Sequence, residues 1–159
     1  MVMAENHLLH LGKLVGNLQS LEGLLRCYLL NIDQTPPASK GTLYWNLKTG
    51  DVVPEDAFTN YDTLGDLINK YNADVQSRDA GLRVDPSLVS VRDLLAHGRV
   101  AAGAPDPSLL KIVKFNRPSD GNVKVVAAAL MDETWFKAQN SLVLTQLKHV
   151  HAAYKRFAI

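Results

Sequence analysis

The sequence predicts a mainly α-helical protein, a bundle of about four helices with a β-hairpin inserted before the C-terminal helix. The helices are expected over residues 5–31 and 64–77, in the stretch 91–99 that ends in a glycine, and from about 132 to 157, where apolar residues recur at spacings of three and four. The hairpin is expected where two β-branched, apolar runs flank a turn-forming stretch. With 159 residues, of which 47% are hydrophobic, the simplest organisation is a single domain, 1–159, with one core.

The composition indicates a cytoplasmic protein without a membrane segment. The chain has one cysteine, Cys27, so it has no partner for an internal disulfide. The N-terminal residues do not have the basic and then apolar pattern of a secretory signal. No apolar run approaches the roughly 20 residues that span a bilayer. We therefore expect neither membrane association nor secretion.

The first predicted helix, residues 5–31, carries an apolar seam that suits a helical bundle or a contact between helices of a dimer. Packing in the core of the same chain is the default interpretation. The seam consists of Leu11, Leu14, Leu18, Leu21, Leu25 and Tyr28. His7 and His10 share a face of this helix, but no third ligand accompanies them, so no metal site is expected.

The helical spacing of apolar residues is interrupted over residues 33–61. Prolines at 36 and 37 end the helix, and residues 42–53 are expected to form a small hairpin around the turn at Gly50. Tyr44 and Trp45 lie in this region. They are candidates for stacking on RNA bases, although aromatic residues in a long loop more often cover the edge of a core.

The second helix, residues 64–77, is expected to be capped by Asp62 or Thr63. Its apolar face consists of Leu64, Leu67, Ile68, Tyr71 and Val75. Residues 109–115 and 123–130 are the expected hairpin strands, joined by a turn over 116–121. The last helix is expected to begin near Asp132, which is a plausible cap. Its buried face is expected to hold Phe136, Val143, Leu147, Val150, Tyr154 and Phe157.

The helix predicted in the stretch 91–99 carries the polar residues on which the functional prediction depends. Arg92 and Asp93 are followed by Leu-Leu-Ala and then His97, and we expect Gly98 to end the helix in the left-handed conformation. Asp93 and His97 are four residues apart and therefore nearly aligned along the helix. Arg92 and His97 are separated by about 140° around the helix axis. All three residues point away from the predicted core.

This pattern resembles the Arg-x4-His motif of the HEPN superfamily of small helical domains. The family motif is an arginine, a polar residue, a short variable run and a histidine, which Arg92, Asp93 and His97 match in full. The resemblance implies a HEPN-like helical bundle and a metal-independent ribonuclease without a cofactor. It also implies a homodimer and a setting in toxin–antitoxin or phage-defence modules, with a cognate antitoxin or other partner protein. Some members of the family are catalytically silent.

The residue types suit RNA cleavage without a metal. This reaction activates a 2′-hydroxyl, protonates the leaving 5′-oxygen and stabilises charge on the phosphoryl oxygens. His97 suits either proton transfer, Arg92 suits the phosphate, and Asp93 is placed to orient the imidazole of His97. The reaction needs two proton transfers, but the motif has only one histidine. A dimer whose two-fold axis brings two Arg/His pairs to one cleft would supply the second histidine.

The distribution of charge gives mild support for an RNA partner. The chain has a net charge of +1, but residues 78–130 hold eight Lys/Arg and five Asp/Glu, a net of +3. Arg99, Lys111 and Lys114 lie in this segment and are the predicted RNA-binding residues. A chance fluctuation of surface charge explains the same numbers. We predict no DNA partner.

The same residues fit three other interpretations. Asp93 and His97 form an ordinary exposed helix pair in many proteins. A non-catalytic dimeric module that binds RNA, a nucleotide or a partner protein would leave RNA intact. A purely protein-binding domain would have no salt-dependent affinity for nucleic acid. The sequence has no phosphate-binding loop, zinc-ligand spacing, nucleophile elbow or dinucleotide fingerprint.

Overall fold

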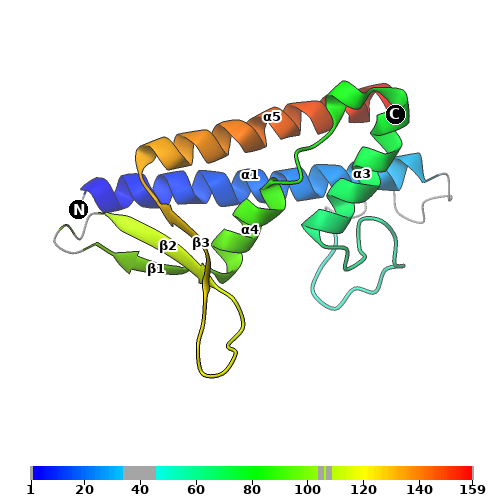
Figure 1. The fold of residues 1–159 in the computed structure, drawn as a ribbon. Coiled ribbons are helices and arrows are strands. Elements are labelled where there is room, and N and C mark those ends of the chain that lie inside the picture. The colour runs from blue at the N-terminus through cyan, green and yellow to red at the C-terminus, as the bar shows by residue number, and fades with distance from the viewer. Residues whose placement is uncertain (1, 34–45, 104–105, 107–108, 159) are drawn as a thin grey trace. The chain divides into compact units, whose positions relative to one another are not determined.

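The computed structural model describes residues 2–33, 46–103, 106 and 109–158. These residues form four α-helices, one 3-10 helix and one three-stranded antiparallel sheet (Figure 1). The helices are α1 (Val2–Ile32), α3 (Leu64–Arg78), η1 (Ala80–Leu82), α4 (Leu88–His97) and α5 (Glu133–Phe157), and the strands are β1 (Arg99–Ala102), β2 (Leu110–Phe115) and β3 (Val125–Leu130). The mainly helical class and the hairpin before the last helix are confirmed.

The chain divides into two compact units. The first consists of Met1–Leu18 and Pro86–Thr145, and the second of Gln19–Asp85 and Gln146–Ile159. Both α1 and α5 contribute residues to each unit. Within the described part of the chain, no helix combines the length and the apolarity that crossing a membrane requires.

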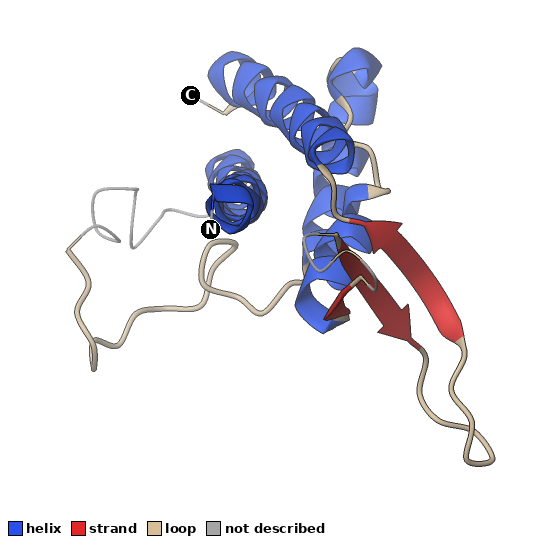
Figure 2. Cartoon of the chain, turned by 90° about the vertical axis from the view of Figure 1, so that its left-hand side faces the viewer, coloured by secondary structure: helices blue, strands red, loops and turns tan. Residues whose placement is uncertain are grey.

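The sheet belongs to the first unit and has the order β1-β2-β3 (Figure 2). Val113 on β2 pairs with Arg99 on β1 and with Ala128 on β3, and the β2–β3 register shifts at a bulge between Lys114 and Phe115. The predicted hairpin is therefore present as β2 and β3. Strand β1 was not expected, because its four residues are all exposed and carry no alternating pattern.

The core of the first unit lies between the helices and one face of the sheet. Asn17 on α1 donates to Asn140 on α5 at 2.9 Å. The side chain of Asp132 accepts a 2.7 Å hydrogen bond from the Trp135 backbone N–H, so it caps α5 as predicted. The buried apolar residues of this unit are Leu14, Leu18, Leu88, Leu94, Ile112, Met131, Phe136 and Val143.

The core of the second unit is formed by the apolar faces of α3 and of parts of α1 and α5. All five residues predicted for the face of α3 are buried. Thr63, one of the two predicted caps, begins α3 in a capping box with Asp66. The buried apolar residues outside α3 are Leu21, Leu25, Tyr28, Leu29, Val84, Val150, Ala153 and Ala158.

Two polar side chains on helices of the second unit form hydrogen bonds with the backbone of its loops. Asn72 on α3 is buried and forms two 2.8 Å hydrogen bonds with the backbone of Val84, one to its N–H and one to its carbonyl. Arg26 on α1 donates to the backbone carbonyls of Asn60 at 3.1 Å and Asp62 at 2.8 Å. These contacts hold the connections on either side of α3.

The hairpin expected over residues 42–53 is not formed in its described part. Residues 46–53 contain a turn, in which Gly50 has a positive φ of 98°, but no strand. The Asp51 backbone N–H donates to the Lys48 carbonyl at 3.0 Å and closes this turn. The other half of the predicted hairpin, with Tyr44 and Trp45, lies outside the described residues.

Candidate functional site

Helix α4 presents the polar residues of the motif to solvent. Its spacing of apolar residues places Leu88 and Leu94 in the core, whereas Arg92 and His97 are exposed and Asp93 is half-buried. The orientation of these side chains away from the core therefore agrees with the helical periodicity. Both Arg92 and His97 are accessible to a large ligand.

Gly98 ends α4, but not in the left-handed conformation that the sequence suggested. Its φ of −73° and ψ of 156° are extended, and the chain passes directly into β1. The reason for glycine here is steric. A Cβ would lie 2.4 Å from the carbonyl oxygen of Leu94 and 2.5 Å from Cγ1 of Ile112. The absence of a side chain lets the end of α4 approach β2, which holds His97 beside the sheet.

The carboxylate of Asp93 interacts with two cations and not with His97. It lies 3.4 Å from Nη1 of Arg92 and 3.4 Å from Nζ of Lys114, which β2 brings to the helix. Asp93 and His97 are four residues apart on α4, which would allow their side chains to meet, but within the described residues neither a hydrogen bond nor an ion pair joins them. Because the three paired side chains are partly exposed, the ion pairs contribute little to stability.

The three predicted RNA-binding residues lie on two faces of the sheet. Lys114 and Ile112 point toward α4, as the contacts of Lys114 with Asp93 and of Ile112 with Gly98 indicate. Side chains alternate along a strand, so Lys111 lies on the opposite face. Arg99 is on that face too, since its guanidinium carbon lies 5.6 Å from the ring centroid of Phe115. The structure thus groups Lys114 with Arg92 and Asp93, and separates them from Arg99 and Lys111.

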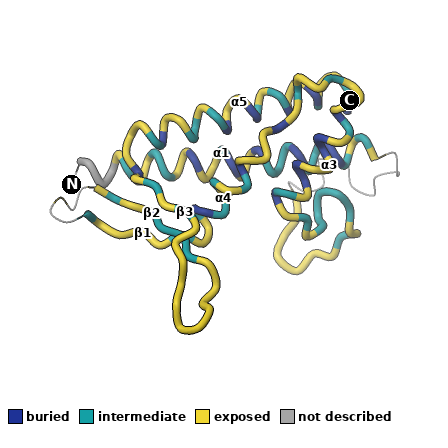
Figure 3. Tube along the Cα trace, in the orientation of Figure 1, coloured by how far each residue is buried: buried dark blue, intermediate teal, exposed yellow. Residues whose placement is uncertain are grey.

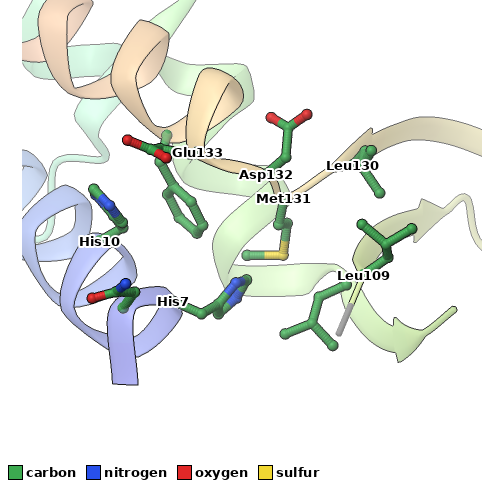
Figure 4. A pocket seen from close by; sticks show the side chains of 10 residues that line it. His7, His10, Leu109, Leu130, Met131, Asp132 and Glu133 are labelled. Atoms are coloured by element: carbon green, nitrogen blue, oxygen red, sulfur yellow. The ribbon is translucent and has the colours of Figure 1, made fainter. Parts of the chain in front are cut away.

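A pocket of about 430 Å³ lies elsewhere in the first unit (Figure 4). His7 and His10 from α1 contact the ring of Phe136, with centroid separations of 5.0 and 5.7 Å. None of the described residues of the motif lines this pocket. Its lining consists of Asn6, His7, His10, Leu109, Leu110, Leu130, Met131, Asp132, Glu133 and Phe136.

The titratable groups of this pocket influence one another. Burial lowers the pKa of His7, and the nearby charge of His10 lowers it further. The 2.6 Å ion pair with Lys137 lowers the pKa of Glu133. Among the described residues, no three His, Cys, Asp or Glu side chains are grouped as metal ligands. No local sequence pattern indicates this pocket, because Asp132 and Glu133 are more than 120 residues from the histidines.

No protein-family model matches this chain, and neither does any curated protein or solved structure. The functional assignment therefore depends on the residues of α4 and the sheet.

Proposed function

We propose that this protein is a metal-independent endoribonuclease of the HEPN type, active as a homodimer. The observation that carries the proposal is the joint exposure of Arg92 and His97 on α4, a helix whose end is held against β2 by the Gly98 contact. A catalytic pair needs both access to substrate and a rigid support. The position of Arg92 and His97 is compatible with both requirements.

In this proposal, His97 transfers protons and Arg92 holds the scissile phosphate. The 2′-oxygen attacks phosphorus while its proton passes to one imidazole. The bond from phosphorus to the 5′-oxygen then breaks, and a second imidazole donates a proton to that oxygen. The products are a 2′,3′-cyclic phosphate and a 5′-hydroxyl. The second imidazole is His97 of another copy, which is why the active form is a dimer.

The sequence suggested that Asp93 orients the imidazole of His97, but its position in the structure favours a different role. Its carboxylate is close to Arg92 and Lys114, so in this proposal it competes with phosphate for these two cations and does not orient the imidazole. When a phosphate binds, the guanidinium exchanges a carboxylate partner for a phosphate partner. By resemblance to the family, we extend the proposal to a cytoplasmic toxin–antitoxin or phage-defence protein with a cognate partner.

The test is RNA cleavage in the presence of EDTA. Purified protein is incubated with a mixed RNA substrate, beside Arg92→Ala and His97→Ala variants and a Lys148→Ala control on α5. We expect the wild type and the control to cut, and the two motif variants to lose at least about a hundredfold in rate, the usual contribution of a proton-transfer group. Cleavage that persists in both motif variants would overturn the proposal.

A second candidate is a HEPN-like module that binds RNA without cutting it. The observation in its favour is that, in the described residues, His97 has neither a carboxylate nor a backbone partner to orient it, while Asp93 is engaged elsewhere. Intact RNA in all reactions, together with salt-dependent binding by the folded protein, would select this candidate.

A further inference from the structure

We propose that the face of the sheet turned away from α4 binds a single strand of RNA and leads it to His97. This inference deepens the proposed function, on which it rests for the role of His97. The outer face, as we call this surface, consists of Arg99 and Ala101 on β1, Lys111, Val113 and Phe115 on β2, and Val125, Ala128 and Leu130 on β3.

The register of the strands gathers these side chains on one side of the sheet. Lys111 pairs with both Ala101 and Leu130, and Val113 pairs with both Arg99 and Ala128. Paired residues in a sheet point to the same side, so these rows form one continuous surface. Leu130, at one end of this surface, also lines the pocket beside residues of α1 and α5. Arg99, Ala101, Lys111, Ala128 and Leu130 are all exposed, and Figure 3 shows the strands largely in the colour of exposed residues.

The charge of the outer face matches a polyanion. Arg99 and Lys111 are its charged residues, and none of the three strands contains an acidic residue. On the opposite face, by contrast, Lys114 is engaged with the carboxylate of Asp93. The two cations of the outer face lie on neighbouring strands, so they can contact successive phosphates of one nucleic acid strand.

Phe115 gives the outer face a group on which a base can stack. Its ring is half-buried, and the guanidinium of Arg99 lies over it at 5.6 Å. Aromatic rings and guanidinium planes on an open sheet bind unpaired bases by stacking, whereas paired bases in a duplex do not present these surfaces. The surface therefore suits a single strand.

The outer face begins close to the end of α4 in the sequence. Arg99, the first residue of β1, is two residues beyond His97, which ends α4. An extended chain spans at most about 7 Å over two residues. The backbones of Arg99 and His97 are therefore within about 7 Å of each other, and in this proposal the outer face supplies affinity that the few residues of the motif lack.

Binding is tested with a dye-labelled single-stranded RNA in EDTA, by fluorescence anisotropy, in a His97→Ala background that leaves the RNA intact. The double variant Arg99→Gln/Lys111→Gln is compared with Lys13→Gln/Lys148→Gln, which removes two exposed cations outside the sheet. We expect at least about a tenfold loss of affinity for the first variant only. The slope of log affinity against log salt should decrease by about 1.4, for two lost phosphate contacts with a single strand.

The Phe115→Leu variant distinguishes the contribution of base stacking to RNA affinity from the contribution of charge. It keeps an apolar side chain but removes the ring, so we expect about a fivefold or greater loss of affinity with an unchanged salt slope. A duplex of the same sequence should bind more weakly than the single strand. Circular dichroism at each step confirms that the variants are folded.

Equal affinity of the outer-face and control variants would overturn the inference. If the outer-face variants instead lose self-association while their RNA affinity stays unchanged, the surface is a protein interface and the inference is also wrong. RNA cleavage is also measured for the outer-face variants in a background that keeps His97, because this measurement tests the RNA path separately from the proposed nuclease activity. RNA that is bound through the outer face but never cut refutes the nuclease alone, whereas undiminished cutting by the outer-face variants refutes the RNA path alone.

Discussion

Gly98 lies so close to Ile112 that a Cβ on the glycine would be 2.5 Å from Cγ1 of the isoleucine. This contact joins the end of α4 to the middle strand of the sheet. It fixes the residue immediately after His97 against a buried side chain, because Ile112 is only 2% exposed. The position of the motif therefore depends on a contact between residues 14 apart in the chain.

Gly98→Ala is expected to destabilise the protein and displace His97. The added methyl group clashes with a backbone carbonyl as well as with Ile112, so the helix end must shift. Overpacking of this kind costs about 1–3 kcal/mol. Urea unfolding measures the loss, and RNA cleavage in EDTA measures the displacement. Gly16→Ala is the matched control: a Cβ there meets nothing within 4 Å, and replacing a helical glycine should stabilise by about 0.5–1 kcal/mol. Equal effects of the two substitutions would contradict the steric explanation.

Asp93→Asn is expected to strengthen RNA binding about threefold without a large change in stability. The substitution removes a negative charge beside Arg92 and Lys114 and frees both cations for phosphate. Because these ion pairs are partly exposed, the free energy of unfolding should change by less than about 1 kcal/mol. Anisotropy with single-stranded RNA at two salt concentrations measures the effect. Glu55→Gln, at an exposed position in the second unit, controls for net charge. Weaker binding by Asp93→Asn would mean that the carboxylate holds the cations in their binding positions.

Asn72→Ala is expected to be strongly destabilising. The side chain bonds both the N–H and the carbonyl of Val84 in a buried setting, and its removal leaves two backbone groups without partners. The cost is about 3 kcal/mol. Chemical denaturation measures it, with Asn69→Ala at an exposed position of the same helix as the control. A loss no greater than that of the control would show that water replaces the amide at Val84.

His7 is expected to make stability depend on pH in the weakly acidic range. Its folded-state pKa lies below the ordinary value of 6.5, chiefly because of burial, so the unfolded chain binds the proton more readily. The contribution of His7 is fully present above pH 6.5 and is lost as the pH falls through the folded-state pKa. Thermal unfolding between about pH 7 and pH 5 should show a falling midpoint. His7→Gln should reduce this slope, whereas His151→Gln, on an exposed position of α5, should not. An unchanged slope in His7→Gln would assign the pH dependence to other groups.

The helices could be predicted from the sequence because burial imposes a repeating pattern on each of them. The five apolar residues of α3 are all buried, and its cap is one of the two that were expected. The hairpin could be predicted because turn-forming residues separate two apolar runs. Strand β1 could not be predicted, since it is short, fully exposed and held only by its pairing with β2.

The sequence by itself determined that Arg92, Asp93 and His97 share a helix and that Arg92 and His97 avoid its buried face, because helical periodicity is a local property. Only the tertiary structure decided which residues meet them. Lys114 reaches Asp93, and Gly98 packs on Ile112, through the placement of β2 against α4. Strand alternation alone places Lys111 and Lys114 on opposite faces of the sheet, whereas the packing of one face on α4 decides that Lys114 is the lysine that meets Asp93. The partners of a side chain depend on contacts between distant segments, and no local pattern encodes them.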